Sequence, residues 1–137
     1  MKFVIYGEPV SKGRPRFSNR GGFIKTYTPQ KTQAYENLVK LSYQQQVKDM
    51  KFLEGNLRAN ITAYFSIPQS ISLKKKEQLK SECVHVMKKP DCDNIAKIIL
   101  DSLNKIAYDD DKQVVQLCVE KFYSDTPRVE VELLEVV

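Results

Sequence analysis

The sequence predicts an α+β fold, a two-layer sandwich in which helices pack on one face of a mixed or mainly antiparallel sheet. Stretches in which apolar and polar residues alternate, as in strands, stand at both ends and in the middle of the chain. Stretches with the apolar spacing of helices lie between them. The 137 residues are enough for one core, so we expect residues 1–137 to form a single domain.

The first half of the chain is expected to hold two strands and a helix. Residues 2–6 read as a short strand, and residues 7–29 as a long loop of the kind that is usually functional. A helix begins after Pro29, where an apolar stripe continues to about Lys51. The clearest strand covers residues 57–67, in which apolar and polar side chains alternate strictly.

The second half is expected to supply a short helix and three strands. Ser72 is placed to cap a helix that runs to Leu79, and residues 83–87 read as a strand that leads into an acidic segment. Residues 113–123 and 128–136 each alternate as strands do, and the four residues between them are typical of a turn. We therefore predict that these last two strands form a hairpin.

The segment from Lys89 to Lys97 is the centre of the functional argument. Pro90 disfavours a helical conformation at the residue before it, so we expect an extended entrance with Asp91 and Asp93 pointing the same way. A helix should follow, with Asp93 or Asn94 as its N-cap. Its apolar face would be formed by Ile95, Ile98, Ile99, Leu103 and Ile106.

The distribution of charge points to a cation. The chain carries a net charge of +5, yet the segment from Asp91 to Asp111 holds six acidic residues and two lysines, a local charge of −4. Two carboxylates about 5 Å apart repel by roughly 3 kcal/mol at an effective dielectric of about 20. Oxygen ligands without usable His or Cys suit Mg²⁺ or Mn²⁺. The alternative is that these acids are solvated helix caps.

The N-terminal loop is the best candidate for binding a phosphate backbone. Residues 1–31 contain seven Lys or Arg residues and one acidic residue, Glu8. The proposed DNA contacts from this loop are Lys12, Arg14, Arg16, Arg20 and Lys25. The lysines between residues 74 and 80 could also touch DNA, and for both regions the alternative is ordinary solvated surface charge.

Cysteine usage and hydropathy exclude several classes of protein. The three cysteines are odd in number and show no C-x-x-C spacing, which argues against a disulfide framework or a zinc site. No apolar run approaches the roughly 20 residues of a membrane span, and no signal-peptide core is present. We therefore expect a cytoplasmic protein with no membrane partner.

Three motifs resemble the RusA-type Holliday junction resolvases, a family common in prophages and bacteria. They are the stretches Lys89–Lys97, Asp101–Asn104 and Asp110–Val114, and the early segment Gly7–Phe17 is similar to members of the family as well. The chain departs from the family pattern at Cys92, where an aliphatic residue is usual. This change is small in size and leaves the carboxylates in place.

The resemblance implies a small, homodimeric, Mg²⁺-dependent endodeoxyribonuclease. Such an enzyme would resolve four-way DNA junctions by paired symmetric nicks during recombination and repair. Carried over to this chain, Asp91, Asp93 and Asp111 would be the catalytic, metal-binding carboxylates and Lys97 the catalytic lysine.

The residues themselves leave several alternatives open. Asp110 competes with Asp111 as the third carboxylate, and Asn94, Asp101 and Asp110 are assigned to the surroundings of the ion. The chain could instead be a nuclease for other branched DNA, or a DNA-binding module without catalysis. A structural Ca²⁺ site of the EF-hand type fails, because Ala96 stands in place of the required Gly and Ser102 in place of Glu.

Overall fold

A four-stranded mixed sheet forms one layer of the molecule in the computed structural model, which describes residues 1–22, 24–49, 51–81 and 84–137. The strand order is β1-β6-β4-β5. The β1–β6 and β6–β4 pairs are antiparallel, and the β4–β5 pair is parallel. These strands are β1 (Lys2–Tyr6), β4 (Leu57–Ser66), β5 (Val114–Ser124) and β6 (Arg128–Glu135).

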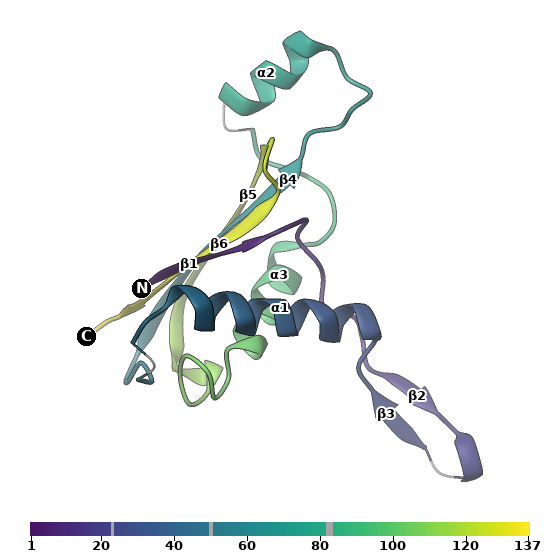
Figure 1. Cartoon of the computed structure of the whole chain (residues 1–137), viewed down its shortest axis with the longest axis vertical. Coiled ribbons are helices and arrows are strands. Elements are labelled where there is room, and N and C mark those ends of the chain that lie inside the picture. Colours follow the sequence, from purple (N-terminus) through teal and green to yellow (C-terminus); the bar gives the residue numbers. More distant parts are fainter. Residues whose placement is uncertain (23, 50, 82–83) are drawn as a thin grey trace.

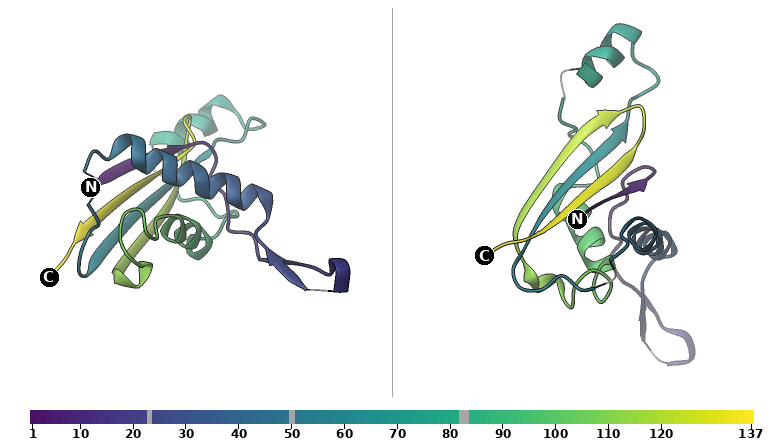
Figure 2. Two further views of the ribbon diagram at one scale, coloured as in Figure 1. Left: turned by 60° about the horizontal axis from the view of Figure 1, so that its bottom comes forward. Right: turned by 60° about the vertical axis from the view of Figure 1, so that its left-hand side comes forward.

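Two of the three α-helices found in the described ranges form the second layer. Helices α1 (Gln30–Gln46) and α3 (Cys92–Ser102) contact each other and cover the same face of the sheet (Figures 1 and 2). Helix α2 (Leu73–Ser81) stands beyond one end of the sheet, near β5 (Figure 1). The predicted α+β class and mixed sheet are therefore confirmed. In the described ranges, no helix is long and apolar enough to cross a membrane.

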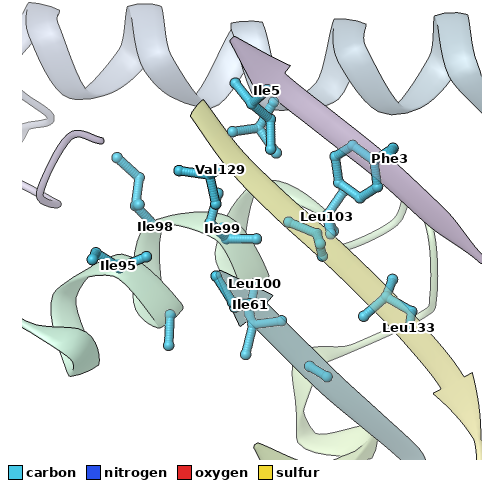
Figure 3. Packing of buried hydrophobic residues seen from close by; sticks show 14 of the residues in the cluster. Phe3, Ile5, Ile61, Ile95, Ile98, Ile99, Leu100, Leu103, Val129 and Leu133 are labelled. Atoms are coloured by element: carbon cyan, nitrogen blue, oxygen red, sulfur yellow. The ribbon is translucent and has the colours of Figure 1, made fainter. Parts of the chain in front are cut away.

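The core lies between the sheet and the two helices α1 and α3. Alternate residues of β4 from Leu57 to Phe65 are buried, as the strict alternation in the sequence predicts. The apolar side of α3 meets them, and Figure 3 shows Ile95, Ile98 and Ile99 facing the inner side of the sheet. This packing fixes which way the polar side of α3 points, because a helix that buries one face presents the opposite one to solvent.

The predicted hairpin between the last two strands is wrong. Strands β5 and β6 exist near the expected positions, but β4 lies between them, and β6 pairs with β4 and β1. Strand β4 has the longest apolar face, so the sheet buries the most apolar area when β4 lies inside it. The short connection crosses the end of β4, where the Arg128 guanidinium lies 3.9 Å from the ring centre of Tyr64.

Other element assignments also differ from the predictions. Helix α3 ends at Ser102, so Ile106, which was expected on its apolar face, lies beyond it. The expected loop 7–29 contains a hairpin of β2 (Arg16–Ser18) and β3 (Lys25–Tyr27), with the short helix η1 (Arg20–Gly22) between its strands. Helix α1 ends at Gln46 rather than near Lys51, because Val47 adopts an extended conformation. In place of a strand at 83–87, the described residues form a single bridge between His85 and Phe122, and Cys83 lies outside the described residues.

The two borders of the sheet are treated differently. At β1, the outward backbone groups of Val4 are hydrogen-bonded by the Gln46 side chain, whose Oε1 accepts from the Val4 amide at 2.8 Å and whose Nε2 donates to the Val4 carbonyl at 2.6 Å. At β5, the apolar side chains of Val115 and Leu117 are 55% and 49% exposed. One border is thus covered at Val4 by a side chain of the same molecule, and the other carries exposed apolar side chains.

Candidate active site

The first two candidate carboxylates stand at the beginning of α3. The Ile95 amide donates to the Asp91 carbonyl at 3.0 Å, so the helix starts at Cys92 and Asp91 occupies the N-cap position. The predicted N-cap, Asp93 or Asn94, is therefore wrong, and so is the expectation that Asp91 and Asp93 project alike from an extended segment. Asp91 and Asp93 are both exposed, and Asn94 is half-buried.

A polar stripe continues from Asp93 along α3. Asp93, Lys97 and Asp101 are spaced four residues apart, which places them on one face of the helix. At 1.5 Å per residue, the eight residue steps from Asp93 to Asp101 span about 12 Å along the axis. The spacing of Lys97 and Asp101 would allow an ion pair, but Asp101 Oδ2 accepts from Lys12 Nζ at 2.6 Å instead. Among the described residues Lys97 is exposed and has no ion pair.

The other carboxylates meet at the far end of this stripe. The Asp111 carboxyl group lies near those of Asp101 and Asp110, which act on it electrostatically. Burial and these two neighbouring carboxyl groups raise the pKa of Asp111 to about 6. Asp111 therefore takes up a proton more readily than an ordinary aspartate as the pH falls.

Asp110 has a different environment from its neighbour. Its Oδ1 accepts from the Lys112 amide at 2.8 Å, and this bond holds the pKa of Asp110 below its usual value. Asp110 is the N-cap of the short helix η2 (Asp111–Gln113), so its carboxylate already has a structural role. This difference favours Asp111 over Asp110 as a group available to a ligand.

The Gln113 side chain fixes the turn that carries these acids. Its Oε1 accepts from the Asp109 and Asp110 amides at 3.1 and 3.2 Å. Its Nε2 donates to the carbonyls of Leu53 and Gly55, both at 3.1 Å. All four hydrogen bonds of the amide are used, so the acidic turn is held against the chain that leads into β4.

The C-terminal end of α3 also holds this turn. The Asn104 Oδ1 atom accepts from the Asp111 amide at 2.8 Å. The buried Tyr108 hydroxyl donates to the Leu100 carbonyl at 2.6 Å. Burial, together with the acids nearby, raises the pKa of Tyr108, so the hydroxyl keeps its proton and its bond.

The N-terminal loop reaches the acidic group through Lys12. The Gly13 amide donates to Thr32 Oγ1 at 2.9 Å, and a side chain at Gly13 would meet that oxygen at 2.8 Å. This close approach holds Lys12 where its ammonium can pair with Asp101. Lys12, which was predicted to contact DNA, is therefore already paired in the protein alone.

The other predicted DNA contacts lie on or near the hairpin that extends away from the body of the molecule (Figures 1 and 2). Arg14 and Lys25 are exposed. Arg16 belongs to β2 and Arg20 to η1, while their side chains lie outside the described part of the structure. Two aromatic residues of the hairpin, Phe17 and Tyr27, are 73% and 48% exposed.

The donor groups along this face suit a hard cation. They are carboxylate and amide oxygens, and the raised pKa of Asp111 indicates uncompensated negative charge. Within the described ranges, no group of three or more His, Cys, Asp or Glu residues is close enough to enclose an ion. Mg²⁺ is commonly held by one or two carboxylates, with water and substrate phosphates completing its shell, so the residues fit that ion without such a cluster.

Sequence reasoning gave no role to two residues that shape this region. Gln113 belongs to the motif Asp110–Val114, but its four hydrogen bonds depend on the fold. Lys121 is 9% exposed on the helix-covered face of β5. The sequence could have indicated this residue, because a lysine occupies a position at which the alternation of the strand predicts an apolar side chain.

Comparison with known proteins adds two findings. A family model described as "Endodeoxyribonuclease RusA" matches residues 6–134. The chain is also similar to the uncharacterized protein YqaN of Bacillus subtilis (strain 168), with 41% identity over 138 residues, covering 99% of this chain and 96% of the relative. The family match includes β4, β5, nearly all of β6 and every candidate acidic residue, and it begins at the last residue of β1.

Proposed function

Because this chain belongs to the RusA endodeoxyribonuclease family, we propose that it resolves four-way DNA junctions by paired symmetric nicks in the presence of Mg²⁺. Nucleases of this family are metal-dependent. The observation that carries the proposal is the acidic face of α3, which begins at Asp91 and ends against Asp111. A face that gathers such negative charge in a protein of net charge +5 favours a cationic ligand. A metal-dependent nuclease binds such a ligand at its active site.

Each side chain of this face has a role in the proposal. Asp91 and Asp93 at one end of this face and Asp111 at the other would each offer a carboxylate to Mg²⁺ or Mn²⁺, which when bound neutralises phosphate charge and lowers the pKa of a water molecule. Lys97, unpaired and between the two acidic groups, would orient that water or stabilise the charge of the transition state. Asn94, Asp101 and Asp110 would hold these groups in place.

Binding of the DNA itself must come from elsewhere, because the acidic face repels phosphate. The extended β2–β3 hairpin and the adjacent loop carry the exposed cations Arg14 and Lys25. The exposed rings of Phe17 and Tyr27 are available to stack on unpaired bases at a branch point. These features support a branched DNA as the partner.

Incubation with a labelled four-way junction and a linear duplex of the same sequence tests the proposal. We expect nicks at symmetric positions of the junction with Mg²⁺, no cleavage with EDTA, and little cleavage of the duplex. Forked and flapped DNA of the same arms are compared in the same assay. Preferred cutting of forks or flaps would establish a nuclease for other branched DNA, and binding without cutting under all conditions would contradict the enzyme.

The open border of β5 supports the proposal of a homodimer. Near its C-terminal end β5 bridges to His85, whereas its N-terminal part carries the exposed apolar side chains of Val115 and Leu117 and is suited to pairing with a second copy. A twofold axis there would present two acidic faces to the two symmetric strands of a junction. Paired nicking then needs no second kind of site.

Substitution of Leu117 by Lys should convert the dimer into a monomer, because the twofold contact would bury one positive charge from each copy. Sedimentation velocity measures the change. The matched control is Leu73→Lys, since Leu73 is 80% exposed on α2, and it should remain dimeric. A dimer that survives Leu117→Lys, or a parent protein that is monomeric at micromolar concentration, would contradict this interface.

A further inference from the structure

The buried lysine of β5 has an unusual environment. Lys121 is 9% exposed, and its register partner on β4 is the buried Ala63. Its Nζ atom donates to the Lys88 carbonyl at 2.5 Å and lies 5.4 Å from the ring centre of Phe65. Among the described residues, no carboxylate forms an ion pair with it.

Burial of an ammonium group is costly unless a partner compensates it. One carbonyl and one aromatic ring offset only part of that cost, and a methionine would fill the same volume without it. The position is therefore poorly explained by packing alone. What distinguishes the lysine from an apolar residue is its ability to hold the backbone at Lys88.

That backbone leads directly to the candidate carboxylates. The Val86 amide donates to the Lys121 carbonyl at 3.1 Å, so residue 121 holds the segment through its main chain and its side chain. At the other end of the segment, Cys92 Sγ lies 3.8 Å from the Val119 carbonyl. Pro90, between these contacts, is buried. Strand β5 thus holds the segment 86–92 on both sides of the point where Asp91 begins α3.

We propose that Lys121 is a positioning residue that fixes the 86–92 segment and thereby sets the placement of Asp91 and Asp93. This role rests on the proposed function, in which those carboxylates act on a DNA phosphate. Displacement of a reacting group by about 1 Å can reduce a rate by about 100-fold, so loss of one anchoring bond is enough to matter.

The test compares Lys121→Met with the parent by amide hydrogen exchange, single-turnover junction cleavage and junction binding. We expect exchange at the amides of residues 87–93 to rise about tenfold, because the carbonyl of Lys88 loses its charged donor. Cleavage should fall between about 10-fold and 100-fold, with binding measured in EDTA changed less than twofold. Lys121→Arg keeps a donor for that carbonyl and should restore most of the protection.

Two control variants separate anchoring from other effects. Ile61→Val lowers stability in the core without touching the segment, and it should leave local exchange and cleavage as in the parent. Lys88→Met removes the other ammonium over the Phe65 ring, at 5.6 Å, and should leave local exchange slow. Equal loosening of the segment in either control would overturn the proposal.

The remaining outcomes are also decisive. Unchanged exchange in Lys121→Met, or a loosened segment with full cleavage, would overturn the positioning role. A separate variant, Asp93→Asn, tests the proposed function itself. If Asp93→Asn cuts as fast as the parent, the carboxylates are not catalytic, whereas the exchange result for Lys121→Met would still report on the anchor.

Discussion

Substitution of Asp93 by Asn should reduce junction cleavage by about 10³-fold, with the affinity for the junction within about threefold of the parent. The amide has the size of the carboxylate but not its charge, so it binds Mg²⁺ poorly. The side chain is exposed in the first turn of α3, and the fold should therefore tolerate the change. Single-turnover cleavage and gel-shift binding in EDTA measure the two effects.

Asp125→Asn is the matched control for this experiment. Asp125 is an exposed aspartate near α2, where it pairs with Lys80 at 2.8 Å, far along the sequence from the acidic face. Its substitution should leave cleavage unchanged. Parental cleavage rates in Asp93→Asn would remove this residue from the catalytic set, and a comparable loss of binding would show that it acts by holding the DNA.

Asp111→Asn should stabilise the metal-free protein while it abolishes cleavage. The pKa of Asp111 is raised to about 6 in the folded protein. The stability that comes from its protonation is full below the ordinary pKa of 3.8 and is lost as the pH rises through 6. At pH 7.5 the parent therefore carries an unfavourable charge that Asn removes. Allowing for solvent screening, we expect a gain of about 1 kcal/mol, or about 4 °C in Tm.

Thermal unfolding in EDTA at several pH values measures this effect. The difference between parent and Asp111→Asn should shrink as the pH falls from 7 to 4, and added Mg²⁺ should stabilise the parent more than the variant. Asp110→Asn is the matched neighbour. Because Asp110 caps η2 and its pKa is lowered, this substitution should lower Tm at pH 7.5. A lower Tm for Asp111→Asn in EDTA would contradict the assignment.

Local sequence patterns predicted most of the helices and strands, because strand alternation and helix capping depend on residues close together in the sequence. The alternation from Leu57 to Phe65 predicted β4, and Ser72 was correctly placed as a cap, since its Oγ accepts from the Lys75 amide at 3.2 Å. The hairpin of β5 and β6 failed because neighbours in sequence can be separated by a strand that buries more apolar area. No local pattern shows that β4 takes that place.

For the candidate site, too, some features could be predicted from the sequence and others depend on the fold. The acidic residues were recognisable by their number and spacing, and the family resemblance is confirmed over residues 6–134. The contact of Asp111 with Asp101, and the pairing of Asp101 with Lys12 rather than with Lys97, arise from segments far apart in the sequence. Such contacts set the pKa of Asp111, and they can be read only once the chain is folded.

The Gln46 side chain covers the middle of β1, because it bonds both outward backbone groups of Val4. A strand from another molecule would find no free partner at Val4, so pairing along β1 is disfavoured. If two copies associate through β5 as proposed, their β1 strands lie at the outer borders of the joined sheet. The covered position at Val4 would then disfavour the addition of a third copy.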